Sequence, residues 1–163
     1  MNRSGFTLLE VLVAVTIIAL LSGISLVGYN RFQERQQLVS AKEQLRSDLR
    51  LTQQKALSGE KPAGWCAATG QTLAGWRLVF TSSTIYEIRG ICSSGATVTD
   101  KSVTLTGNAA KISPDSQIDF VPLTGAAAAA ASFTLQTNTA SGTWRATVSV
   151  TDSGLIESSD ISL

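Results

Sequence analysis

The sequence predicts an α+β fold in which one long N-terminal α-helix packs on a C-terminal antiparallel β-sheet domain. Three observations predict this architecture. An apolar run without any charge extends from Val11 to Tyr29. Residues of high helix propensity, with no Pro or Gly among them, continue from Asn30 to Leu57. Beyond Lys61, apolar and polar residues alternate in short segments separated by turns, a pattern typical of β-strands.

The apolar run has the length and composition of a membrane span. A helix needs about 20 residues to cross a hydrocarbon core of about 30 Å, and the run supplies nineteen uncharged residues. Arg3 and the terminal amine precede it, so the positive-inside rule places the N-terminus in the cytoplasm and the rest of the chain outside. A cleaved secretory signal is the alternative, but the next segment continues as helix. We therefore expect residues 6–29 to span the cytoplasmic membrane once.

Residues 30–58 are expected to form the second, amphipathic half of the same helix. One apolar stripe recurs at steps of three and four, and it consists of Leu38, Ala41, Leu45, Leu49, Thr52 and Ala56. Ser58-Gly59, with Pro62 close behind, is a stop signal for the helix. Counted from Phe6, the helix has about 50 residues and a length of about 75 Å.

Residues 59–163 are expected to form a β-rich extracytoplasmic domain, with one sheet face packed on the helix stripe. The strand candidates are Gly64–Ala68, Trp76–Phe80, Ile85–Cys92, Ser102–Leu105, Gln117–Val121, Ser132–Thr137 and Thr143–Thr151. The run Ala126–Ala131 is too short for a stable isolated helix, so we expect a surface loop or an irregular sheet edge there.

Two cysteines, Cys66 and Cys92, lie 26 positions apart and form no C-x-x-C pair. In an oxidising compartment they predict one structural disulfide. The alternative is a pair of buried thiols in a cytosolic fold. The membrane segment favours the disulfide, because it places the domain outside the cytoplasm.

The composition argues against catalytic chemistry. The chain has no histidine, which removes the commonest general base and most zinc sites. Ser58 and Lys61 fit an S-x-x-K pattern, but no S-D-N or K-T-G motif accompanies them. The carboxylates of the C-terminal part fall mostly in turns and lack the spacing of a calcium loop. We therefore expect no enzyme, no cofactor and no metal site.

The segment Gly5-Phe6-Thr7-Leu8-Leu9-Glu10, ahead of the uncharged run, resembles the class III signal of type IV pilins and of type II secretion pseudopilins. The resemblance implies that a prepilin peptidase cuts between Gly5 and Phe6 and methylates the new amine. Met1–Gly5 would then be the leader peptide. Ser4 stands where a basic residue commonly precedes the glycine, with Arg3 one place further back.

The same resemblance implies a structural role without a cofactor. The chain would assemble with other pilin or pseudopilin subunits, on an inner-membrane assembly platform, into a type IV pilus or a type II secretion pseudopilus. Glu10 is the residue that assembly would use. A charge inside a membrane is costly, but Glu10 lies at the cytoplasmic edge of the run. In a filament it needs a cation, which the Phe6 amine of a neighbouring subunit would supply.

Features of the C-terminal part look similar to the H-type pseudopilins and related minor pilins. They are Cys66 in the first strand, the G-W-x-x-x-F segment (Gly75, Trp76, Phe80), and a late strand that runs into Asp-Ser-Gly. Some of these relatives bind DNA through an arginine that follows a C-terminal glycine. Here that place reads Gly154-Leu155-Ile156-Glu157, and residues 60–163 carry six bases against eight acids. Nucleic acid is therefore not an expected partner.

A second class of function is a membrane-tethered extracytoplasmic binding module, used for adhesion or DNA uptake. In that case the N-terminal helix would be a simple anchor, and Glu10 would be an ordinary acid at the membrane interface. The state of the N-terminus separates the two classes. A pilin loses Met1–Gly5 and carries a methyl group on Phe6, whereas a tether keeps its N-terminus.

Overall fold

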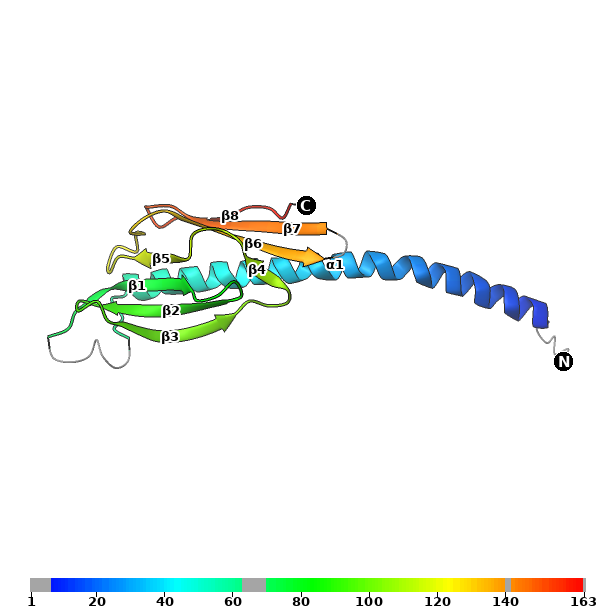
Figure 1. Ribbon diagram of the computed structural model, residues 1–163, viewed down its shortest axis with the longest axis horizontal. Helices are drawn as coiled ribbons and strands as arrows, with labels where there is room; N and C mark the ends of the chain where they lie inside the picture. The colour runs from blue at the N-terminus through cyan, green and yellow to red at the C-terminus, as the bar shows by residue number, and fades with distance from the viewer. Residues whose placement is uncertain (1–6, 63–69, 140–141, 163) are drawn as a thin grey trace, which may run out of the picture.

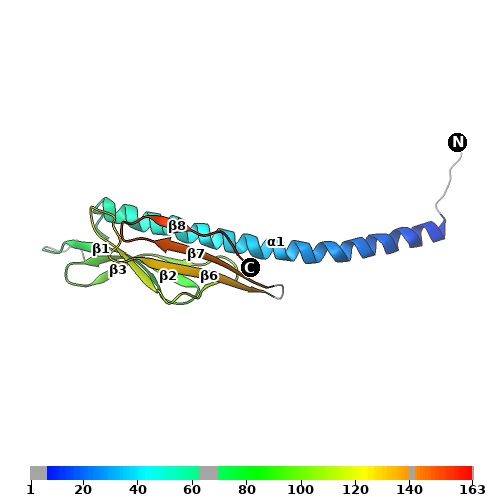
Figure 2. The same ribbon diagram turned by 90° about the horizontal axis from the view of Figure 1, so that it is seen from above.

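The computed structural model describes residues 7–62, 70–139 and 142–162, with the side chains of 23–31 and 138–139 excepted. It consists of one long helix with a β domain packed on its second half, while the first half projects from the domain (Figures 1 and 2). The start of α1 and the domain therefore lie at opposite ends of the described structure. This arrangement confirms the predicted fold class.

The helix α1 extends over Leu8–Leu57, which is 50 residues. It begins after Thr7, whose side-chain oxygen accepts a hydrogen bond from the Glu10 backbone N–H at 3.3 Å, as an N-cap residue does. It ends at Ser58, and Gly59 follows with a φ of +64°. A left-handed residue directly after the helix is the usual terminator. Both the length and the stop at Ser58-Gly59 agree with the sequence prediction.

The β domain contains two four-stranded sheets, and every strand pairs antiparallel with its neighbours. The first sheet has the order β3 (Thr97–Thr104), β2 (Ile85–Cys92), β1 (Leu73–Phe80), β5 (Gln117–Phe120). The second has the order β4 (Ala109–Lys111), β6 (Ala131–Thr139), β7 (Gly142–Val150), β8 (Ile156–Ser158).

Six of the eight strands overlap strands predicted from the sequence. The two that were missed, β4 and β8, have three residues each, which is too short for alternation to be recognised. The candidate Gly64–Ala68 lies outside the described residues. Within the alanine run, Ala128 to Ala130 form an exposed connection, whereas Ala131 is the first residue of β6.

The core forms where α1 meets the inner faces of both sheets. All six residues of the predicted stripe, from Leu38 to Ala56, are 0% exposed. Large side chains from both sheets complete the core, and they include Trp76, Tyr86, Phe120 and Phe133. The second half of α1 therefore serves as the central element of the domain, and the first half is left without a partner.

A polar contact ties α1 to the first sheet within this core. The Asp48 carboxylate, which is 5% exposed, accepts hydrogen bonds from the Tyr86 hydroxyl and from Lys101 Nζ, both at 2.7 Å. Burial, and after it the hydrogen bond to Asp48, raises the pKa of Tyr86 above its usual value of 10. The folded state thus retains the phenol proton at a pH where a free tyrosine releases it.

We expect this contact to make stability fall at alkaline pH. Above about pH 10 the unfolded chain releases the Tyr86 proton while the folded chain keeps it, so the free energy of unfolding decreases as pH rises. The slope from this group is at most about 1.4 kcal/mol per pH unit. Urea unfolding between pH 8 and pH 11, compared for the wild type and Tyr86→Phe, measures it. Parallel pH profiles for the two proteins would contradict the prediction.

Two glycines with nearly the same φ angle show how closely the turn after β7 is packed against its neighbours. Gly95 and Gly154 have φ angles of +84° and +86°. An added Cβ meets nothing within 4 Å at Gly95, but at Gly154 it would lie 2.4 Å from the carbonyl oxygen of Gly125. Gln53 of α1 links both turns to the helix, because its Nε2 donates hydrogen bonds to the carbonyls of Gly125 and Gly154.

Gly95→Ala should therefore lower the free energy of unfolding by about 1–2 kcal/mol, the cost of a left-handed alanine. Gly154→Ala should lower it by about 1–3 kcal/mol more, because the carbonyl must also move. Urea midpoints of the two variants provide the comparison. Equal losses would show that the turn after β7 adapts freely and does not depend on the absence of a side chain.

Candidate functional site

The projecting first half of α1 exposes a large apolar surface that no other part of the described chain covers. Its large apolar side chains are exposed on every side of the helix, and they are Leu8, Leu9, Val11, Leu12, Val13, Val15, Ile17, Ile18, Leu20 and Leu21. A helix that is apolar all round is stable only when lipid or other protein surrounds it. This half-helix is therefore the candidate functional site, and it needs a partner outside its own chain.

The two hydroxyls in the described part of this half-helix are already satisfied. Thr16 Oγ1 donates to the Val13 carbonyl and Ser22 Oγ to the Ile18 carbonyl, both at 2.8 Å. A hydroxyl that donates to a carbonyl of its own helix needs no hydrogen-bond acceptor from the surroundings. The surface from Val11 to Ser22 can thus enter an apolar environment without an orphaned side-chain donor.

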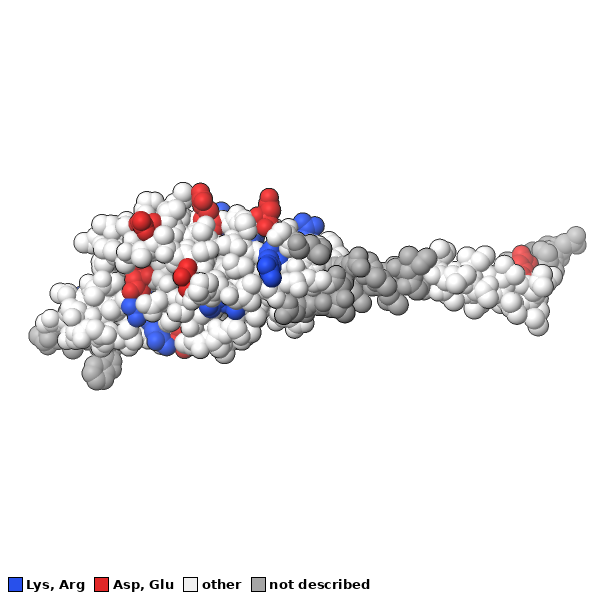
Figure 3. All heavy atoms as spheres, turned by 45° about the horizontal axis from the view of Figure 1, so that its top comes forward, with Lys and Arg blue, Asp and Glu red and all other residues white. Residues whose placement is uncertain are grey.

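Glu10 is the exception to this apolar surface. It lies in the first turn of α1 and is exposed. Figure 3 shows acidic surface near the end of the projecting helix, separate from the charged side chains over the domain. A carboxylate there is stabilised by the positive end of the helix dipole. Glu10 is therefore available to a cation that approaches the start of the helix.

The two residues predicted for processing lie beyond the described part of the chain. Gly5 and Phe6 are among residues 1–6, so their geometry relative to Glu10 stays a prediction. Within the residues that the structure describes, no helix has the length and apolarity that a membrane crossing requires. The span expected at 6–29 includes Phe6 and side chains that are not described.

Of the two cysteines, the structure describes only Cys92. It is 1% exposed at the end of β2 and is not a free thiol. Cys66 lies outside the described residues, so the pairing of the two cysteines stays a prediction.

The G-W-x-x-x-F segment belongs to the core. The Trp76 indole N–H donates to the Glu60 carbonyl at 2.8 Å, and Lys55 Nζ lies 4.8 Å from the centre of the Trp76 ring. Phe80 packs against Tyr86 and Phe133, with ring centres 5.3 and 5.6 Å away. A Cβ at Gly75 would lie 2.9 Å from the Phe120 carbonyl oxygen. These contacts fasten β1 to its neighbours and to the end of α1, so the segment has a structural role.

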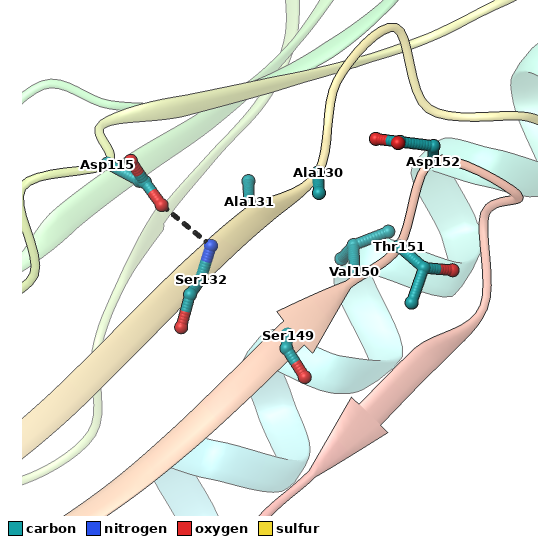
Figure 4. A pocket seen from close by; sticks show the side chains of 8 residues that line it. All are labelled: Asp115, Ala130, Ala131, Ser132, Ser149, Val150, Thr151 and Asp152. Carbon is teal, nitrogen blue, oxygen red and sulfur yellow. Dashed lines mark hydrogen bonds between the residues drawn. The ribbon is translucent and has the colours of Figure 1, made fainter.

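A shallow hollow of about 480 Å³ lies where β6 begins and β7 ends, and the sequence did not suggest it (Figure 4). Its rim carries Asp115 and Asp152, but the Asp115 carboxylate accepts a hydrogen bond from the Ser132 backbone N–H at 2.8 Å. Asp115 therefore joins the loop before β5 to β6. Among the described residues, no three potential metal ligands lie close enough together to hold an ion.

Comparison with known proteins identifies both halves of the chain. Residues 41–154 match the family described as Type II transport protein GspH. Residues 1–26 match the prokaryotic N-terminal methylation motif. No curated protein and no solved structure gives a match.

The two matches correspond to the two parts of the structure. The first covers most of the β domain and of the helix stripe packed on it, and the second covers the projecting half-helix with Glu10. The family is one of structural subunits, anchored in the inner membrane by the N-terminal helix and assembled with other pseudopilins. The alternative of a tethered binding module is not favoured. The chain belongs to the GspH family of type II transport proteins and is a pilin-like structural subunit that prepilin peptidase processes.

Proposed function

We propose that this subunit enters a type II secretion pseudopilus through an ion pair between Glu10 and the Phe6 amine of a neighbouring subunit. Cleavage between Gly5 and Phe6 would remove residues 1–5 and create that amine. Residues 6–29 would lie first in the inner membrane and then in the filament core. The observation that carries the proposal is an apolar half-helix that projects from its domain with a single acid, Glu10, at its free end.

Charge placement supports this order of events. At the edge of the membrane, Glu10 stays in contact with water and needs no partner. In the filament core the surroundings are apolar, and an unpaired carboxylate there is strongly disfavoured. The amine of a processed Phe6 has the opposite charge and lies at the same end of the helix. A neighbour that is shifted along the axis can therefore bring its amine to Glu10.

The β domain, residues 59–163, is proposed to lie outside the inner membrane and to carry a Cys66–Cys92 disulfide. Closing a loop of this length would stabilise the folded state by about 3 kcal/mol in the chain-entropy model. Other pseudopilins, the prepilin peptidase and the inner-membrane assembly platform are the proposed partners. Alkylation of the denatured protein without reductant tests the disulfide, since both cysteines should then resist the reagent.

The intact mass of the protein from the membrane fraction of its own host tests the processing step. We expect loss of Met1 to Gly5 and one methyl group on Phe6. A Gly5→Leu variant should keep its N-terminus, because a large side chain replaces the smallest residue at the cut. A wild-type chain that keeps Met1 in the membrane fraction would contradict the proposal and favour a simple anchor.

A further inference from the structure

Phe32 and the polar side chains that follow it on α1 lie between the projecting half-helix and the core of the domain. Phe32 is 66% exposed, whereas Leu38 is 0% exposed within the core. We propose that this part of α1 binds the phospholipid headgroups on the domain's side of the inner membrane while the subunit awaits assembly. The inference goes beyond the proposed function. It rests on the proposed span at residues 6–29 and is independent of the pairing of Glu10.

A shallow hollow of about 240 Å³, which we call the polar hollow, lies between α1 and the connection from β3 to β4. Its lining side chains all carry a hydroxyl or a carboxamide, and they are Gln33, Gln36, Gln37, Ser40 and Thr106. The Thr106 hydroxyl lies 3.4 Å from Gln44 Oε1. A Cβ at Gly107 would lie 2.7 Å from Gln37 Oε1, so the connection approaches the helix closely. The helix and the domain therefore form the polar hollow together.

The dimensions of the helix place Phe32 and the polar hollow at the level of the headgroups. The apolar run ends at Tyr29, and the helix rise puts Phe32 about 5 Å and Gln36 about 11 Å beyond that end. The headgroup layer extends about 5–8 Å beyond the hydrocarbon core. Side chains of a helix point toward its N-terminus, which here is toward the membrane. Gln36 can therefore reach the headgroups, and the Phe32 ring can enter their boundary with the acyl chains.

The charges at this end of the domain favour contact with lipid phosphates. β3 ends and β7 begins on the side of the domain that faces the projecting half-helix (Figure 1). The sequence has no Asp, Glu, Lys or Arg at 102–110 or at 131–144. The charged residues of α1 at this level are Arg31, Glu34 and Arg35, which leaves one net positive charge. A neutral or basic surface approaches an anionic leaflet without repulsion.

The lining of the polar hollow matches the chemistry of a phospholipid headgroup. Carboxamide N–H groups and hydroxyls donate hydrogen bonds to phosphodiester oxygens, and carboxamide oxygens accept them from an ethanolamine ammonium or a glycerol hydroxyl. The polar hollow is also continuous with the membrane anchor through Phe32, whose ring suits the first carbons of the acyl chains. Membrane lipid is therefore the occupant that this position and this chemistry favour together.

Photocrosslinking of the full chain, reconstituted in vesicles of phosphatidylethanolamine and phosphatidylglycerol, tests the proposal. A photoreactive amino acid replaces Gln36 or, as the matched control, Gln54. Both are exposed glutamines of α1, and Gln54 lies on the same side of the helix, about five turns farther from the membrane. We expect position 36 to gain the mass of one phospholipid, attached at its headgroup or glycerol, and position 54 to gain none. Equal lipid yields, or an adduct to a second protein chain in place of lipid, would overturn the proposal.

A probe at Ile18 separates this inference from the proposed span. Ile18 lies within the apolar run, so we expect its adducts on the acyl chains of the lipid. Lipid adducts from position 18 without any from position 36 would exclude headgroup binding and leave the span intact. A failure of position 18 to crosslink lipid would remove both.

Thr106→Asp tests whether the polar hollow itself, and not closeness to the membrane, captures the lipid. A carboxylate in the wall of the hollow repels phosphate, so the lipid yield from position 36 should fall at least about fivefold, while the yield from position 18 stays the same. Thr106 is exposed, so the urea midpoint should not change. Ser94→Asp is the control, because Ser94 is exposed in the turn between β2 and β3 at the opposite end of the domain (Figure 1). An undiminished yield in Thr106→Asp would contradict binding in the polar hollow.

Discussion

Glu10→Ala should leave the chain in the membrane but reduce its incorporation into filaments by at least about tenfold. Membrane insertion depends on the apolar side chains of α1, and removing a charge at the edge of the span does not weaken it. In the proposed assembly, Glu10 is the partner of an amine that would otherwise be buried without a counter-charge. Breaking a buried ion pair by removing one partner costs about 3–5 kcal/mol, which is more than the tenfold loss requires.

Membrane fractionation and immunodetection of sheared filaments measure the two effects separately. Glu43→Ala is the matched control, since Glu43 is an exposed glutamate of the same helix and its nearest cations lie at 3.5 and 3.6 Å. That variant should insert and assemble normally. Assembly of Glu10→Ala at the wild-type level would remove the role assigned to Glu10.

Asp48→Ala should lower the free energy of unfolding by about 3 kcal/mol, the largest loss expected from a single polar side chain of the domain. The variant leaves the buried Tyr86 hydroxyl without its acceptor, and an orphaned buried donor carries a desolvation penalty of about 1–3 kcal/mol. It also separates Lys101 from its counter-charge. Since the Lys101 side chain is 45% exposed, water replaces part of that interaction, which keeps the loss below that of a fully buried pair.

Urea unfolding of the detergent-solubilised full chain measures this loss. A double-mutant cycle with Tyr86→Phe isolates the contact between the two residues, and we expect the two losses to be clearly less than additive. Glu43→Ala again serves as the control and should change stability by less than about 0.5 kcal/mol. Additive losses would mean that Asp48 and Tyr86 stabilise the domain independently.

The helix was predictable because its signals are local. The stripe from Leu38 to Ala56 follows from spacing alone, and the stop at Ser58-Gly59 follows from residue types. Asp48 could not be found in this way. Its partners Tyr86 and Lys101 lie 38 and 53 positions away, so the sequence shows only one more charge on an amphipathic helix. The turn at Leu123, whose φ is +63°, was equally hidden, because leucine is not a residue that marks such turns.

The sequence indicates which residues belong to the candidate site, but it does not show how those residues are arranged relative to a partner. Thr7, Leu8 and Glu10 are placed at the start of a projecting helix, as the motif led us to expect. The proposed partner of Glu10 belongs to another subunit, and no property of a single chain specifies how two subunits are shifted along a filament axis.

Zero-length crosslinking of filaments assembled from isotopically heavy and light subunits tests the central claim most directly. Carbodiimide joins a carboxylate to an amine only where the two are in contact. We predict an amide between Glu10 and the Phe6 amine, found by mass spectrometry in hybrid heavy–light peptides, which shows that it joins two subunits. If the Glu10 amide occurs only within single chains, or if Glu10 is recovered unlinked from intact filaments, the pairing between neighbours is wrong.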